Sequence, residues 1–448
     1  MINNLTGSQI KTGNFTVSGG AIYGTFSGSI IPSSIIPFAS PASYVIFSGS
    51  ITGVSGSFFA ISGSNNQLAF NSSDFSILLA STWNSLSNGG KIFIRAGTYS
   101  IVNTPSLSPT SNITLEGEGA ATIIQLANGA SRPIINISGS FSNFILANIT
   151  IDGNGSNQTN VNNISLISFP STSTSAIRIL NCVFQNSRNS CIATAASDTL
   201  IVSSRFSNNV LGLGFGTGFQ TGGNFFISPI LITGNASQSN VRIIGNAFEN
   251  NFGCISDVDL SSTNVIITNN VFKNNYTYVN VSVNAFAGVI INDNVFSFAA
   301  GGNTLTNFIA LGSTDTLVQN NYFFGNLTQA HIYAPLGLFN IITDNEFNGS
   351  VGPNNAFILT QSTGNNSFLT ISNNLFKISD SNEKGMSIQN VNNFTIQGNQ
   401  FYLPFGGIPI SFDIAVSSNG IISNNIFNGG SLKFNITPTN VIISGNLP

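Results

Sequence analysis

The sequence predicts an all-β protein in which most of the chain is a parallel β-helix, a solenoid built from stacked coils of β-strands. Two observations predict this fold. An eight-residue unit recurs along the second half of the chain, and the phenylalanine that ends the unit returns every 24 to 29 residues. A repeat of fixed spacing in this range indicates a solenoid, because each unit can bury its apolar face only against its neighbours.

The unit reads as a strand, a tight turn and a second strand. Its copies are VRIIGNAF (241–248), VIITNNVF (265–272), VIINDNVF (289–296), TLVQNNYF (316–323), NIITDNEF (340–347), LTISNNLF (369–376), FTIQGNQF (394–401) and GIISNNIF (420–427). VIISGNLP (441–448) closes the series, and IRILNCVF (177–184) and TLIVSSRF (199–206) are variants that precede it. The third position is always Ile or Val, which are residues that fit a packed, pleated surface.

The sixth position of the unit is Asn in nine copies. Asn tolerates a left-handed backbone and bonds local peptide groups, and amides stacked at one turn can also bond along the solenoid axis. We therefore expect a structural Asn ladder rather than a binding site. Its members are Asn246, Asn270, Asn294, Asn321, Asn345, Asn374, Asn399, Asn425 and Asn446.

A leucine-rich repeat has a similar spacing and is the alternative to a β-helix. Its other half requires helical or extended Leu-rich segments. Here the stretches between units alternate apolar and polar residues, as in YTYVNVSVNAF (276–286), and Leu is less frequent than Ile in the units. Alternation is strand periodicity, so the β-helix is favoured.

An amphipathic helix is expected near residues 73–87, at the start of the coil. Phe75, Leu78, Leu79, Trp83 and Leu86 fall on one helical face, with Ser72 or Ser73 as the N-cap and the glycines at 89–90 as the terminator. Such a helix would cover the first coil, which otherwise exposes apolar side chains and unpaired backbone.

We divide the chain into two regions. Residues 1–66 contain short apolar pieces separated by Gly/Ser doublets and are predicted to form a small β region that serves as an attachment stem. Residues 67–448 are predicted to form the β-helix domain with its capping helix.

The entry into the coil resembles a known family. GGKIFIRAGTYSI (89–101), SNITLEGEG (111–119) and NITIDGNG (148–155) are similar to the first coils of the pectin-lyase-like right-handed β-helix superfamily, which includes polysaccharide lyases, polygalacturonases and phage tailspikes. The resemblance covers about residues 70–448. It implies the fold, but it does not imply one activity, because this fold hosts many functions.

The composition narrows the classes of partner. Charged residues make up 6% of the chain, its net charge is −3, and no basic cluster could follow a phosphate backbone, so nucleic acid is not expected. No apolar run is long enough to span a membrane, and no signal peptide is visible. Abundant Asn-x-Ser/Thr sequons would permit glycosylation of an exposed surface.

The residues offer only weak candidates for catalysis. The motifs that polygalacturonases share are missing, and His331, the one histidine, is not flanked by glycines. Asp257 and Asp259 would share one face of a strand about 7 Å apart, with Glu249 on the same coil. Paired carboxylates at such a distance can cleave a glycoside, but a pair of solvated acids at a turn is the alternative that we favour. No metal or cofactor is predicted.

The second position of the unit should point outward and forms an apolar stripe, for which we expect cover by another subunit or by a segment of the same chain. The residues concerned are Ile266, Ile290, Leu317, Ile341, Ile421 and Ile442. If the cover is another subunit, a trimer is the favoured homo-oligomer.

The sequence favours a structural and adhesive protein over an enzyme. We expect a spike or tail-fibre-type protein at a virion or cell surface, attached to other surface proteins through residues 1–66, with host-surface glycans as candidate ligands. The alternatives are a polysaccharide lyase or glycoside hydrolase of the tailspike type and a surface filament subunit.

Overall fold

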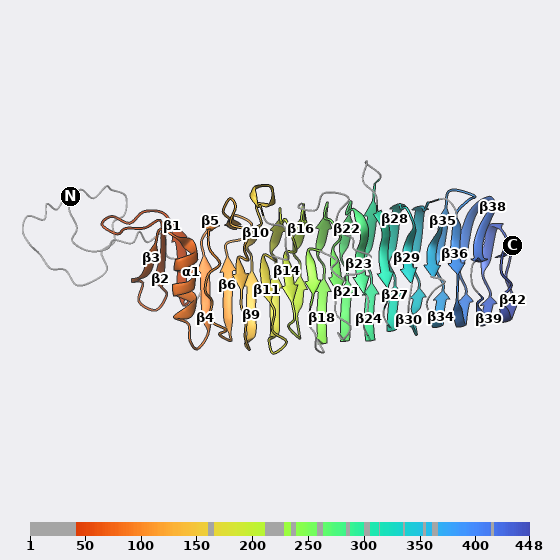
Figure 1. Cartoon of the computed structure of the whole chain (residues 1–448), viewed down its shortest axis with the longest axis horizontal. Helices are drawn as coiled ribbons and strands as arrows, with labels where there is room; N and C mark the ends of the chain where they lie inside the picture. The colour runs from red at the N-terminus through yellow and green to blue at the C-terminus, as the bar shows by residue number, and fades with distance from the viewer. Residues whose placement is uncertain are drawn as a thin grey trace, which may run out of the picture.

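The protein is a long, straight rod with its N-terminal region at one end and its C-terminus at the other (Figure 1). The computed structural model describes residues 42–159, 165–210, 228–233, 239–257, 263–283, 287–299, 305–312, 314–334, 337–352, 355–360, 366–413 and 416–448. These residues confirm the predicted fold class: the chain is mostly β, a solenoid of about 12 turns with one short α-helix near the N-terminus.

Three stacks of parallel strands run along the rod. The first stack contains the first half of each eight-residue unit, because β-branched residues at alternate positions pack into the core there. Its strands are β4 (Gly90–Ile94), β6 (Ile113–Gly117), β9 (Ser142–Ala147), β12 (Ser175–Leu180), β15 (Leu200–Val202), β18 (Ser239–Ile244), β21 (Thr263–Thr268), β24 (Ala287–Asn292), β27 (Thr314–Gln319), β30 (Gly337–Leu338), β31 (Ile341–Thr343), β34 (Asn366–Ser372), β37 (Val391–Gln397), β39 (Ser418–Ser423) and β42 (Thr439–Ser444).

The second stack contains the Phe that ends each unit. Its strands are β5 (Gly97–Ile101), β7 (Thr122–Leu126), β10 (Thr150–Asp152), β13 (Val183–Gln185), β16 (Arg205–Ser207), β19 (Ala247–Glu249), β22 (Val271–Lys273), β25 (Val295–Phe298), β28 (Tyr322–Asn326), β32 (Glu346–Ser350), β35 (Leu375–Ile378), β38 (Gln400–Phe412) and β40 (Ile426–Gly430).

The third stack lies in the stretches between units. Its strands are β8 (Ile135–Asn136), β11 (Ile167–Phe169), β14 (Ile192–Thr194), β17 (Ile230–Ile232), β20 (Ile255–Asp257), β23 (Thr277–Val283), β26 (Leu305–Leu311), β29 (Ala330–Ala334), β33 (Ala356–Thr360), β36 (Lys384–Ile388), the second half of β38 and β41 (Lys433–Phe434). A short 3-10 turn, Gly155–Asn157, lies on a connection.

The N-terminal end of the rod is covered as the sequence predicts. Helix α1 (Phe75–Asn84) and residue Leu86 after it bury all five apolar side chains of the expected face, and the indole Nε1 of Trp83 donates to the Ser108 carbonyl at 2.9 Å. The expected N-cap is wrong by one or two residues. Asp74 caps the helix, because its carboxylate accepts the Ser76 backbone N–H at 2.7 Å.

Between residue 42 and the helix, three strands are described. β1 (Tyr44–Ser48), β2 (Phe58–Ser62) and β3 (Leu68–Ser72) pair antiparallel in sequence order, and β1 also pairs parallel with β4 of the first coil. This part of the predicted stem therefore continues into the solenoid. Residues 1–41 lie outside the described residues, so the stem function and the boundary at residue 66 remain predictions.

Apolar columns fill the interior. The third-position Ile and Val side chains from Ile243 to Ile422 are buried, and Ile443 of the last coil is exposed. The Phe rings from Phe184 to Phe401 form one parallel stack, with neighbouring centroids 4.5–4.9 Å apart and planes within 13°. Equivalent residues of successive coils thus lie directly over one another.

The sixth-position Asn side chains are hydrogen-bonded from coil to coil. Each Oδ1 accepts both the Nδ2 and the backbone N–H of the Asn one coil before it, at 2.9–3.0 Å, from Asn246 through to Asn446. Each Nδ2 also donates to a third-position carbonyl, as Asn321 does to Ile291 at 2.8 Å. The amides satisfy backbone groups that are buried at this corner.

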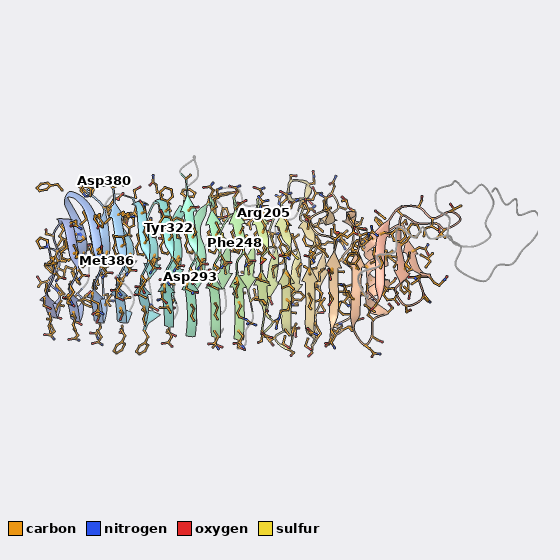
Figure 2. The ribbon with its side chains drawn as sticks, turned by 180° about the vertical axis from the view of Figure 1, so that it is seen from behind. Arg205, Phe248, Asp293, Tyr322, Asp380 and Met386 are labelled. Carbon is orange, nitrogen blue, oxygen red and sulfur yellow. The ribbon has the colours of Figure 1, made fainter. Side chains whose placement is uncertain are left out.

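The left-handed backbone of the turn is at the fifth position and not at the sixth, where the sequence argument placed it. Asn269, Asp293, Asn320 and Asp344 have φ between 52° and 56°, whereas the Asn residues beside them do not have positive φ. The sixth residue instead turns its side chain inward. Asp293 and Asp344 are therefore residues of the turn; Asp293 is labelled in Figure 2.

The apolar stripe is on the outer face of the first stack. Ile266, Ile290 and Leu317 are half-buried, while Ile341, Ile421 and Ile442 are exposed. The intersubunit contact expected there remains a prediction.

His331 and Glu383 are two of the titratable residues that are buried along the rod. His331 lies among the rings of Phe308 and Phe357, and burial lowers its pKa to about 3. Glu383 accepts the Val351 backbone N–H through Oε1 at 3.0 Å, its buried Oε2 has no hydrogen-bond partner, and burial raises the pKa of Glu383 to about 7.

Replacing one amide in the middle of the Asn ladder should destabilise the fold. Asn321→Ala leaves the buried backbone N–H of Asn294 without its acceptor and removes one acceptor of the Asn294 side-chain amide, which should lower the free energy of unfolding by roughly 2–4 kcal/mol. Guanidinium unfolding measures the change. Asn348→Ala, on the outward side of β32, is the control and should change stability by less than about 0.5 kcal/mol. Equal effects of the two substitutions would contradict the structural role of the ladder.

His331→Phe should remove a source of acid sensitivity. The folded state holds His331 neutral down to about pH 3, whereas the unfolded chain binds a proton near pH 6.5, so stability is lost as pH falls between these values. Phe fits the column, because residues 308, 331 and 357 are in register and the other two are Phe. As the pH is lowered from 7 to 3, the thermal midpoint of unfolding should fall less for the variant than for the wild type. Parallel midpoint-against-pH curves for the two proteins would refute this.

Glu383→Gln should remove a loss of stability at high pH, whereas His331→Phe removes a loss at low pH. The pKa of Glu383 is raised from 4.5 to about 7, so its contribution is fully present below about pH 4.5 and is lost as pH rises through 7. The loss is on the order of 3 kcal/mol. Unfolding measured from pH 4 to 9 should show a decline for the wild type that the Gln variant lacks. If the decline persists in the variant, it arises from another group.

Candidate functional site

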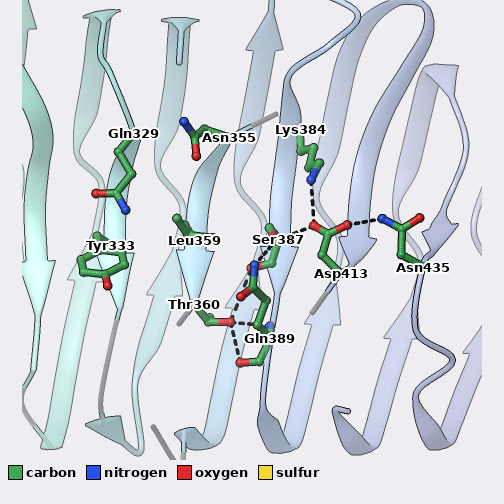
Figure 3. Close-up of a pocket in the computed structure, with 10 residues that line it drawn as sticks. All are labelled: Gln329, Tyr333, Asn355, Leu359, Thr360, Lys384, Ser387, Gln389, Asp413 and Asn435. Atoms are coloured by element: carbon green, nitrogen blue, oxygen red, sulfur yellow. Dashed lines mark hydrogen bonds and ion pairs between the residues drawn. The ribbon is translucent and has the colours of Figure 1, made fainter. Parts of the chain in front are cut away.

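A polar groove of about 490 Å³ lies on the outer face of the third stack, toward the C-terminal end of the rod (Figure 3). It is lined by Gln329, Tyr333, Asn355, Leu359, Thr360, Lys384, Ser387, Gln389, Asp413 and Asn435. A volume of this size falls within the range of roughly 300–1,000 Å³ that small-ligand sites occupy.

The parallel register of the third stack brings these residues together. Tyr333 on β29, Leu359 on β33, Ser387 on β36 and Ser411 on β38 are successive partners across the strands. Side chains at one register point to the same face of a sheet. Residues from separate coils therefore form one continuous surface along the rod axis.

Asp413 is the centre of the groove's hydrogen-bond network. Its Oδ2 accepts from Lys384 Nζ at 2.8 Å, Ser387 Oγ at 2.8 Å and Ser411 Oγ at 2.7 Å, and its Oδ1 accepts from Asn435 Nδ2 at 2.7 Å. Burial by itself would raise the pKa of Asp413, but the hydrogen bonds from Lys384 and the two serines outweigh it and hold the pKa below its ordinary value. The carboxylate is therefore ionised and has four donors.

The network continues along the groove floor. Gln389 Nε2 donates to Ser387 Oγ at 2.9 Å, the Gln389 backbone N–H donates to Thr360 Oγ1 at 2.6 Å, and Thr360 Oγ1 donates to the Gln389 carbonyl at 3.0 Å. Thr360, Ser387 and Gln389 are all buried. A floor whose side chains hold one another in place is preorganised, so that little conformational entropy is lost when a ligand binds.

The walls of the groove offer both polar and apolar contacts. Gln329, Asn355 and Asn435 present amides, which can donate and accept hydrogen bonds. Tyr333 presents a half-buried ring and a hydroxyl, and burial raises the pKa of that hydroxyl, so it is protonated at neutral pH. Leu359 adds an apolar face beside it. The combination suits a ligand that carries many hydroxyl groups and some apolar faces.

Glu383 lies just outside the lining. The residue after it, Lys384, donates its backbone N–H to the carbonyl of Asn355 at 3.0 Å, and Glu383 itself binds the Val351 N–H. Glu383 thus ties together two turns, each of which contributes a residue to the groove.

The acidic residues expected from the sequence are elsewhere. Glu249 ends β19 in the second stack, and its carboxylate pairs with Arg205 at 2.7 Å. Asp257 ends β20 in the third stack, its backbone in register with Ile232; its side chain and the whole of Asp259 lie outside the described part of the chain. A catalytic role for these three residues remains a prediction.

Sequence reasoning missed the groove. Lys384 and Asp413 are 29 residues apart, which is about one coil, and the repeat spacing could have placed them on neighbouring coils. The sequence did not reveal this pair because the strands of the third stack lack a repeated motif from which their register could be read. Within the described ranges, no group of three or more His, Cys, Asp or Glu residues could hold a metal ion. Nor does any helix there have the length and apolar character needed to cross a membrane.

No protein-family model and no curated protein matches the chain. Solved structures do resemble it. A mutant tailspike protein of E. coli bacteriophage HK620 in complex with pentasaccharide is 14% identical, with a TM-score of 0.52 over 82% of this chain and 76% of that chain. PfbA, a surface adhesin of Streptococcus pneumoniae, is 15% identical, with a TM-score of 0.49 over 82% and 86%.

The A-module of the mannuronan C-5 epimerase AlgE6 of Azotobacter vinelandii is 13% identical, with a TM-score of 0.44 over 84% of this chain and 96% of that chain. Identities this low show the fold and no more than the fold. The chain therefore has a right-handed parallel β-helix fold of the pectin-lyase-like type, similar to that of tailspike proteins.

Proposed function

We propose that the protein is a rigid extracellular attachment rod that binds a surface glycan in the groove lined by Tyr333, Lys384 and Asp413. The observation that carries the proposal is the groove itself. Its ordered hydroxyl and amide side chains match the alternating donors and acceptors of sugar hydroxyl groups. The half-buried ring of Tyr333 offers an apolar contact for the face of a sugar ring.

The groove favours binding over cleavage. Hydrolysis of a glycoside ordinarily uses two carboxyl groups, one as acid and the other as base or nucleophile. Among the described lining residues, Asp413 carries the one carboxylate, and four donors already occupy it. Its lowered pKa makes it a poor general acid near neutral pH.

The rod form supports an attachment role. Stacked coils tied by the Asn ladder give a stiff body that can hold a binding groove far from an anchored end. The similar tailspike structure is a complex with pentasaccharide, which agrees with a glycan ligand. We further propose a place at a virion or cell surface, with residues 1–66 as the anchor and the apolar stripe as the contact in a homo-oligomer, of which a trimer is the favoured form.

Truncating the aromatic wall should weaken glycan binding. Tyr333→Ala removes the ring from the groove and should reduce affinity about fivefold or more, because an aromatic anchor commonly contributes more than about 1 kcal/mol. Binding to a printed panel of surface oligosaccharides, followed by titration of the best binder, measures the effect. Tyr402→Ala is the matched control, since Tyr402 is 49% exposed on the second stack outside the groove. A panel without any binder, or equal losses for both variants, would defeat the proposal.

A further inference from the structure

We infer that the groove selects an uncharged oligosaccharide that lies along the rod axis, and that the Lys384–Asp413 pair keeps the site electrically neutral. This inference rests on the glycan-binding function proposed above and specifies the class of glycan.

The two charges of the groove neutralise each other. The side chains of Lys384 and Asp413 are 11% and 8% exposed, and their charged atoms are 2.8 Å apart. The described lining contains no other charged side chain. A carboxylate or sulfate on a ligand would have to leave water without gaining a free cation, and a buried charge without a partner is costly.

The remaining lining provides what an uncharged sugar needs. The amides of Gln329, Asn355 and Asn435 can each donate and accept, as can a sugar hydroxyl. A site that is specific for an acidic ligand would instead contain an ordered arginine, whose guanidinium can bind a carboxylate with two hydrogen bonds, or a lysine without a carboxylate partner. Lys433, one strand beyond Ser411 in register, is exposed and is not part of the lining; its charge is screened by water and salt.

The direction of the ligand follows from the strands. The groove crosses β29, β33, β36 and β38 and reaches Asn435 just after β41. Neighbouring parallel strands lie about 4.8 Å apart, so four steps span roughly 19 Å along the rod. The floor has this length in one direction, which fits an extended chain of several sugar units better than a single sugar.

Removing the anion of the pair tests the inference. Asp413→Asn leaves Lys384 with its charge but without a counter-ion, so the groove becomes cationic. The wild type should bind neutral oligohexoses at least tenfold more tightly than oligogalacturonate and oligomannuronate probes. In Asp413→Asn this ratio should fall at least tenfold, because the acidic probes gain an ion pair. Titrations at low and physiological salt should show that the gain is salt-sensitive.

Two further variants make the result decisive. Glu346→Gln frees Lys377 from an ion pair of 2.7 Å on the second stack, outside the groove, and should leave the preference unchanged. The double variant Lys384→Met/Asp413→Asn removes both charges and so keeps the groove neutral. It leaves no buried lysine without a counter-ion, so it provides a test even if Asp413→Asn alone does not fold. This double variant should retain the preference for neutral probes.

The outcomes separate the two proposals. Three results would overturn the neutral groove but leave glycan binding in place. The wild type could prefer acidic probes, or a folded Asp413→Asn variant could keep the same ratio of neutral to acidic affinity. The third such result is a double variant that binds acidic probes. A wild type that binds none of the probes would remove the glycan-binding function itself.

Discussion

Every part of this rod depends on the register between successive coils. A ladder of amide hydrogen bonds at 2.9–3.0 Å and a stack of Phe rings 4.5–4.9 Å apart can exist only when equivalent residues lie directly over one another. Since the side-chain period of a strand is two, a slip of one residue would turn the isoleucine column outward. The buried amides oppose such a slip, because each has only one place where its donors and acceptor are satisfied.

The same register organises the outer surface. Charged residues of adjacent coils meet across the strands, as Arg205 meets Glu249 and Lys377 meets Glu346. Charged residues make up 6% of the chain, and these pairs neutralise part of that charge. The groove is one more result of this stacking, since its ion pair and its serines come from adjacent coils.

The candidate groove lies where the repeat is interrupted. The units that build the first two stacks are nearly identical from coil to coil, so their surfaces are regular columns. The third stack is built from the stretches between units, where the sequence is free to vary. The groove lies there because Tyr333, Leu359 and Ser387 differ in size and chemistry although they share one register.

The sequence predicted the fold from the repeat together with the alternation between its units, because a leucine-rich repeat of similar spacing would need helical or Leu-rich segments there. It also indicated the stacked amides and the apolar face of the capping helix, since both are local patterns. Tertiary structure decided which turn residue is left-handed, that Asp74 rather than Ser72 or Ser73 caps the helix, and where a ligand could bind. Lys384 and Asp413 are 29 residues apart, and only the register of two coils makes them neighbours. No local pattern in the sequence encodes that register, so the groove is visible only in the folded chain.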